Sequence, residues 1–139
     1  MYDRNEYLIE HYGITAERYA EMMIEQGGVC KCCGQAPTGR PLHVDHCHAI
    51  ARLKFKVVLV ASGIWAAAIP AFNTVLESTI SLKDAKIKAK RWLLAKSVRG
   101  LVCWRCNAGL QSFKESPENL RSAAKYLDSF RAMLYSRVG

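Results

Sequence analysis

Residues 98–107 read VRGLVCWRCN, a short apolar run that leads into a C-x-x-C motif. The run has the length and composition of a β-strand, and the spacing of Cys103 and Cys106 lets both thiolates reach one zinc ion in a tetrahedral site. A second C-x-x-C motif, made by Cys30 and Cys33, stands far earlier in the chain. We therefore expect the two motifs to close one four-cysteine zinc site. The alternative is that these are unpaired cysteines of the core.

The composition of the chain indicates one compact domain. It has 139 residues, of which 50% are hydrophobic. A chain of this length can form one hydrophobic core but is too short for two domains of ordinary size. The N-terminal residues do not resemble a signal peptide, so we expect a cytoplasmic location, where thiols stay reduced. The six cysteines are therefore interpreted as metal ligands rather than as disulfide partners. Cys32 and Cys47 do not fit the two motifs and are expected to be spectators of the zinc site.

Residues 43–48 read HVDHCH and hold three of the four histidines of the chain. His46 can take a proton from water near neutral pH because the unperturbed pKa of histidine is about 6.5. Asp45 and Asn107 offer a carboxylate and an amide oxygen, which suit Mg²⁺. Each residue also has an ordinary interpretation: His43 as a hydrogen-bonded surface histidine, for example, and Asn107 as a helix cap.

The expected order of elements around these residues is strand, strand, helix. Residues 42–46 alternate in polarity as a short strand does, residues 98–103 form the second strand, and a short helix covers residues 104–113. Further helices are expected over residues 14–28 and 116–134, each with a Ser or Thr N-cap. The last helix has an apolar stripe that we expect to be a core or dimer contact. The stripe consists of Leu120, Ala123, Leu127, Phe130 and Leu134.

The middle of the chain, residues 50–96, differs from the rest in charge. It holds nine basic and two acidic residues, and so seven of the eight net positive charges. Within it, residues 57–76 carry no charge over a length that could just span a bilayer. A single crossing would place the two cysteine motifs on opposite sides of the membrane. We therefore expect this run to be buried against the core or a partner subunit, and membrane association is disfavoured.

Residues 81–97 are expected to form a basic amphipathic helix. Such a helix can bind a phosphate backbone or an anionic membrane surface, or its charges can simply be solvated. Two arginines near the second motif can likewise clamp phosphates or be solvated. The candidate DNA contacts are Lys86, Lys90, Arg91, Arg99 and Arg105.

Four stretches of the chain together resemble the phage recombination endonuclease VII family, a member of the His-Me finger (HNH) nucleases. They are GGVCKCCG, HVDHCHA, VRGLVCWRCNAGL and SPENLRSAAKYLDSF, and the resemblance covers about residues 13–49 and 97–130. The chain departs from the family pattern in one place. Members normally join the Asp-His element to the second strand through a few residues, and here residues 50–96 intervene.

The resemblance implies specific roles for the residues of this chain. It implies a structural zinc at the four motif cysteines, a catalytic base at His46, and Mg²⁺ or Mn²⁺ held by Asp45 and Asn107. His43 and His48 match positions that orient the phosphate or support the metal. The implied substrate is DNA, with branched, Holliday-type junctions as the best-known target. A homodimer is implied as well, in the host cell cytoplasm if the chain is phage-encoded.

The expected fold is therefore α+β, a zinc-stapled His-Me finger (ββα-metal) core with flanking helices and a mostly helical insertion. Its parts are an N-terminal helical segment (1–29), the nuclease core (30–49 plus 97–115), the insertion (50–96) and a C-terminal helix (116–139). The expected function is hydrolysis of DNA phosphodiester bonds. The alternatives are a zinc-dependent DNA-binding module without catalysis, a membrane-associated protein, and an insertion that has no function of its own.

Overall fold

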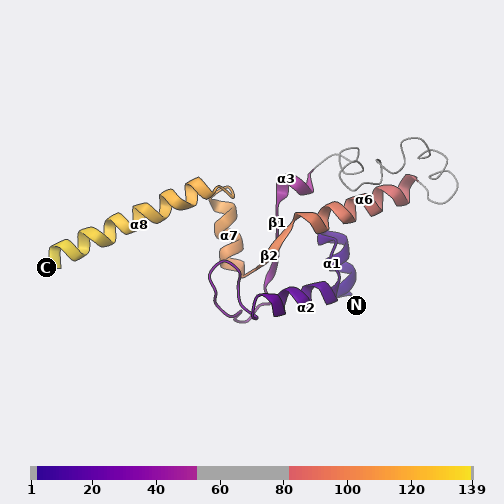
Figure 1. Cartoon of the computed structure of the whole chain (residues 1–139), viewed down its shortest axis with the longest axis horizontal. Helices are drawn as coiled ribbons and strands as arrows, with labels where there is room; N and C mark the ends of the chain where they lie inside the picture. The colour runs from indigo at the N-terminus through magenta and orange to yellow at the C-terminus, as the bar shows by residue number, and fades with distance from the viewer. Residues whose placement is uncertain (1–2, 53–81, 139) are drawn as a thin grey trace.

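The computed structural model describes residues 3–52 and 82–138, and these form an α+β arrangement in which helices surround one small sheet (Figure 1). The elements in chain order are α1 (Arg4–Tyr12), α2 (Ala16–Glu25), β1 (His43–His46), α3 (His48–Ala51), α6 (Leu82–Ser97), β2 (Val98–Val102), α7 (Trp104–Ser112) and α8 (Pro117–Val138). The predicted strand, strand, helix order is confirmed. The apolar run 57–76 lies outside the described residues.

The sheet consists of β1 and β2 in antiparallel pairing, with a bulge in β2. Asp45 pairs with Gly100, and the next residue, His46, pairs with Val98. Arg99 is therefore the extra residue of the bulge. A bulge turns the side chain of its extra residue away from the regular alternation of the strand, and here it brings Arg99 towards β1.

The hydrophobic core lies between the sheet and the N-terminal helices. Its buried members are Leu8, Ile14, Met22, Cys30, Leu42, Val44, Leu101 and Val102. Gln26, just after α2, connects this helix to β2 because its side chain forms a pair of hydrogen bonds with the backbone of Leu101. Nε2 donates to the Leu101 carbonyl at 2.9 Å, and Oε1 accepts from the Leu101 N–H at 2.8 Å. The outward backbone groups of Leu101 are thereby satisfied without a third strand.

The predicted basic helix is confirmed as α6, and it packs against α1 and α3. Ala89, Leu93 and Leu94 of α6 are buried. Gly13 ends α1 in the left-handed conformation and lies directly on the α6 backbone, so that a Cβ there would overlap the carbonyl of Arg91. The described C-terminal part of the insertion thus packs against the rest of the domain, and the alternative of an insertion that has no function of its own stays untested.

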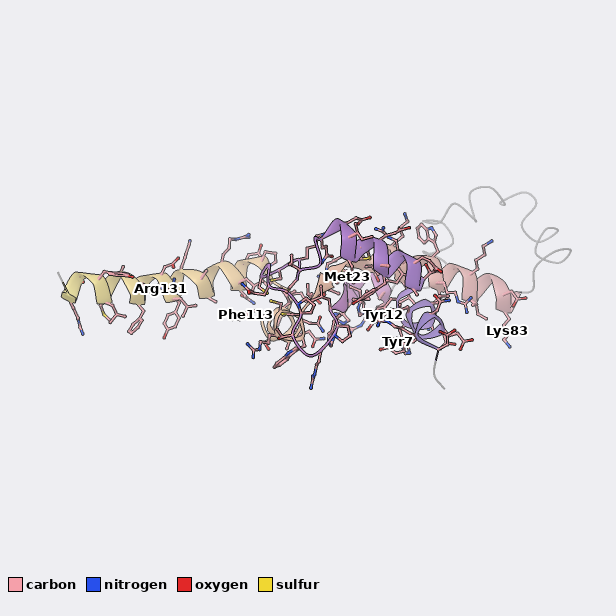
Figure 2. The ribbon with its side chains drawn as sticks, turned by 90° about the horizontal axis from the view of Figure 1, so that it is seen from below. Tyr7, Tyr12, Met23, Lys83, Phe113 and Arg131 are labelled. Carbon is pink, nitrogen blue, oxygen red and sulfur yellow. The ribbon has the colours of Figure 1, made fainter. Side chains whose placement is uncertain are left out.

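The C-terminal helix begins at Pro117 as predicted, but it extends away from the rest of the domain (Figure 1). The view turned by 90° shows it clear of the other elements along most of its length (Figure 2). Leu127, Phe130 and Leu134 of the predicted stripe are 59%, 53% and 45% exposed. None of the described elements covers them, so they are not part of the described core, and the expected dimer contact stays a prediction. Among the described residues, no helix has the length and apolar character needed to cross a membrane.

Candidate metal centre and catalytic site

The four cysteines of the two C-x-x-C motifs come together as predicted. Their sulfur atoms all lie within 4.8 Å of one another, and Cys33 and Cys103 are 4.0 Å apart at Sγ. Tetrahedral zinc with Zn–S bonds of about 2.3 Å separates its sulfurs by about 3.8 Å. The cluster therefore fits a structural zinc. Cys32 and Cys47, the expected spectators, are not part of this cluster.

Backbone N–H groups point at the sulfurs of this cluster. Cys30 Sγ accepts from the N–H groups of Cys33 at 3.5 Å and Cys103 at 3.2 Å, and Cys103 Sγ accepts from Cys106 at 3.5 Å. Burial acts to raise the pKa of Cys30, but these donors outweigh burial and lower that pKa to about 6. A thiolate is the form that binds zinc. The motif thus prepares one ligand before a metal arrives.

The two motifs meet because the sheet holds both. The N–H of Lys31 donates to the carbonyl of Leu101 at 3.0 Å, so the first motif is hydrogen-bonded to β2, and β2 leads directly into the second motif. Cys103 is the N-cap of α7, where its sulfur takes the place of the usual cap oxygen. Asn107 therefore does not cap α7, and that interpretation is wrong.

Asp45 is buried, with 7% exposure, and is paired with Arg99. Arg99 Nε donates to Oδ2 and Nη2 donates to Oδ1, both at 2.8 Å. Hydrogen bonds to Asp45 raise the pKa of Arg99 further above its already high value, as expected of an ion pair in which both groups are charged. The structure thus joins a predicted metal ligand to a predicted DNA contact, a pairing that the sequence did not reveal.

His46 follows Asp45 and is half-buried between two rings. Its imidazole centroid lies 5.6 Å from the ring of Tyr12 and 4.6 Å from the ring of His48. Burial is the main cause of a lowered pKa of His46, and the neighbouring His48 adds to it, while Asp45 and Glu115 act in the opposite direction. The neutral imidazole that a general base requires is therefore favoured at neutral pH.

Glu115 is a member of the site that the sequence did not indicate. Its Oε1 accepts from Arg99 Nη2 and contacts His48 Nδ1, each at 3.0 Å. Although burial acts to raise the pKa of Glu115, the hydrogen bonds with Arg99 and His48 lower it. Glu115 stands in the turn between α7 and α8. A single acidic residue ahead of a Ser-Pro helix start carries no sequence signal for such a role.

The other predicted site residues, His43 and Asn107, have no described contact with this network. His43 opens β1 and is exposed, opposite Val102. Asn107 is half-buried in the first turns of α7, the helix that contacts β1. Their catalytic roles stay predictions.

Four of the five predicted DNA contacts lie on two different helices, and the fifth, Arg99, is the bulge residue of β2. Lys90 and Arg91 are exposed on α6, and Lys86 belongs to the same helix. Arg105 is exposed at the start of α7 beside the cysteine cluster, with its guanidinium 5.3 Å from the centre of the Trp104 ring. Trp104 is itself 45% exposed.

A small sheet joined to a helix through a four-cysteine cluster defines the class: an α+β protein with a structural metal-binding centre. The model of the recombination endonuclease VII family matches residues 5–129, and the chain belongs to that family. Membership implies a nuclease. No curated protein matches the chain, and no solved structure matches it.

Proposed function

We propose that the chain is a metal-dependent endonuclease of the His-Me finger type that hydrolyses DNA phosphodiester bonds, with Asp45 and His46 at the centre of its site. The observation that carries this proposal is the place of these two residues. They are neighbours on β1, and the cysteine cluster fastens the first motif to α7, which contacts that strand. The family supplies the reaction class.

His46 is the proposed general base. Hydrolysis requires the attacking water to lose a proton as it bonds to phosphorus. Because burial and His48 lower the pKa of His46, its imidazole is ready to accept that proton. His43 and His48 are the proposed partners that orient the phosphate.

Asp45 and Asn107 are the proposed ligands of Mg²⁺ or Mn²⁺. An ionised carboxylate has about four lone-pair sites, and Arg99 occupies one at each oxygen of Asp45. The remaining lone pairs fit a hard cation. When bound, such a cation neutralises charge that develops on phosphate oxygens. The amide oxygen of Asn107 would complete the protein ligands from the side of α7.

The proposed DNA-binding surface uses cations of α6 and α7. Lys90 and Arg91, with Lys86, would contact phosphates on one side, and Arg105 would do so beside the cysteine cluster. Arg99 donates to Asp45 and Glu115 through Nε and Nη2, so it would reach a phosphate through Nη1 while keeping these bonds. Contacts to phosphates depend on the charge and shape of the DNA and not on its base sequence. We therefore propose a branched junction as the substrate, without a preferred base sequence. Paired cuts at such a junction need two sites, and α8 is the proposed contact of a homodimer.

A nuclease assay tests the proposal. The zinc-loaded chain is incubated with Mg²⁺ and, side by side, four-way junction, nicked and intact duplex DNA. We expect cleavage that His46→Ala reduces at least a hundredfold, in line with the loss of a general base, while DNA binding persists. His11→Ala is the matched control, since His11 is the one histidine outside the 43–48 stretch. Equal rates for wild type and His46→Ala would refute the role of His46.

One observation favours a second candidate, a zinc-dependent DNA-binding module without catalysis. Both oxygens of Asp45 already accept from Arg99, so the carboxylate is satisfied without a metal. This candidate predicts DNA binding that does not depend on Mg²⁺ and no cleavage of any of the three substrates. Retained binding with Mg²⁺-dependent cutting would exclude it.

A further inference from the structure

The chain leaves α7 through a turn in which two consecutive side-chain-bearing residues are left-handed. Lys114 and Glu115 have φ values of 56° and 55°, a region that residues other than glycine adopt at some cost. The turn is closed by their N–H groups, which donate to the carbonyls of Gln111 and Leu110, both at 2.8 Å. Lys114 remains exposed, whereas the side chain of Glu115 is only 21% exposed. The turn therefore directs Glu115 towards the sheet.

One oxygen atom of Glu115 contacts two elements of the site directly and a third through Arg99. Oε1 accepts from Arg99 in the bulge of β2, and it contacts Nδ1 of His48 at the start of α3, each at 3.0 Å. Arg99 in turn holds both oxygens of Asp45 on β1. Glu115 thus contacts both Arg99, which is hydrogen-bonded to Asp45, and His48, whose ring lies against that of His46.

The contact with His48 determines where that imidazole carries its proton. An ionised carboxylate accepts hydrogen bonds and cannot donate one, and the guanidinium of Arg99 keeps Glu115 in that form. Nδ1 of His48 must therefore carry the hydrogen. In the neutral ring, Nε2 is then left as the acceptor.

We propose that Glu115 is a positioning residue of this site, fixing the Nδ1–H tautomer of His48 and the orientation of Arg99, and through Arg99 the carboxylate of Asp45. Its effect on cleavage rests on the proposed endonuclease function. Its effect on the tautomer does not, and the two can be measured separately.

The first measurement needs no activity. Nitrogen-15 NMR of the imidazoles is recorded on the zinc-loaded protein at about pH 8.5, two units above the ordinary histidine pKa, with the His48 signals assigned from His48→Gln. We expect the Nδ1–H tautomer for His48 in the wild type and in Glu115→Gln, whose amide oxygen can still accept. Glu115→Ala should convert His48 to the Nε2–H tautomer or to a mixture. Glu118→Ala is the matched control, since the described partners of Glu118 are Arg121 of α8 and the cap residue Ser116.

The second measurement is cleavage of four-way junction DNA with Mg²⁺. Loss of a residue that orients others costs about 10–100-fold, so Glu115→Ala should lower kcat by that factor with KM little changed. Glu115→Gln should stay within a few-fold of wild type, as should Glu118→Ala.

The outcomes separate the two proposals. A wild-type protein with His48 in the Nε2–H tautomer overturns the role of Glu115, whether or not any variant folds, and so does a folded Glu115→Ala protein that keeps the Nδ1–H tautomer. A wild type that cuts no DNA while its His48 has the expected tautomer refutes the endonuclease and leaves the positioning role of Glu115 supported.

Discussion

Replacing Arg99 by alanine tests how much the ion pair between Arg99 and the buried Asp45 stabilises the fold. The substitution would leave a carboxylate that is 7% exposed without the two 2.8 Å hydrogen bonds it has now. Removing one partner of a fully buried ion pair costs about 3–5 kcal/mol. The Arg99 side chain is 38% exposed, so water can enter the space it leaves and offset part of this loss. We therefore expect a decrease of about 2 kcal/mol in the free energy of unfolding.

The partner substitution should be milder. Asp45→Asn leaves Arg99 with Glu115 and with solvent, so we expect a loss of about 1 kcal/mol or less. The double variant Arg99→Ala/Asp45→Asn should be no less stable than Arg99→Ala alone, because no buried charge remains unpaired. Urea unfolding at pH 7 and one fixed zinc concentration, followed by circular dichroism, measures all three.

A surface arginine supplies the matched control. Arg18 also has two carboxylate partners, Glu21 at 3.0 Å and Glu25 at 2.7 Å, but all three side chains are exposed. Arg18→Ala should therefore change stability little. If Arg99→Ala is no more destabilising than Arg18→Ala, the buried pair is not a significant support of the sheet and the reasoning fails.

The remaining predictions concern the metal, a close helix contact and the last helix. A strong zinc chelator should abolish the cooperative melting transition, because the cluster joins segments far apart in the chain; an unchanged melting curve after verified metal removal would contradict this. Gly13→Ala should lower the free energy of unfolding by about 2 kcal/mol or more, because the new Cβ would clash with the backbone of Arg91 and the left-handed backbone disfavours alanine. Gly39→Ala is the control: its φ is 72° but nothing lies close to it, so the free energy of unfolding should fall by only about 1 kcal/mol. Phe130→Asp should shift a dimer to monomer in sedimentation measurements without lowering the melting temperature of the zinc-bound domain, and Lys125→Asp should not; a wild-type monomer would remove the dimer proposal.

The features that the sequence predicted are those fixed by local spacing. Cys103, the N-cap of α7, and Cys106, in its first turn, have two residues between them, so local helix geometry brings their sulfurs together. The alternation around Val44 and the Ser-Pro start of α8 are likewise local patterns. The bulge at Arg99 is different, because the extra residue depends on how two strands from distant parts of the chain are registered. Glu115 depends on two left-handed residues that the sequence does not mark with glycine.

The exposed stripe of α8 shows a limit of another kind. Leu127, Phe130 and Leu134 follow a helical period whether they face a core or a second chain. Periodicity therefore establishes the helix and its apolar side, but not what covers that side. The described residues of one chain do not cover this side, so the choice between a core and a dimer contact is not decided by periodicity.

The position of the insertion explains how a long segment can interrupt the sheet without separating its strands. The chain leaves β1 at Cys47 and returns at Ser97, and the N–H of Cys47 donates to the carbonyl of Ser97 at 2.8 Å. Ser97 is itself 1% exposed, with its hydroxyl donating to the carbonyl of Leu94 at 2.6 Å. The chain segments that lead into and out of the insertion are therefore hydrogen-bonded to each other, directly beyond the pair formed by His46 and Val98. Since the entropic cost of closing a loop grows only slowly with its length, the length of this segment adds little to the cost of pairing the two strands that carry Asp45, His46 and Arg99.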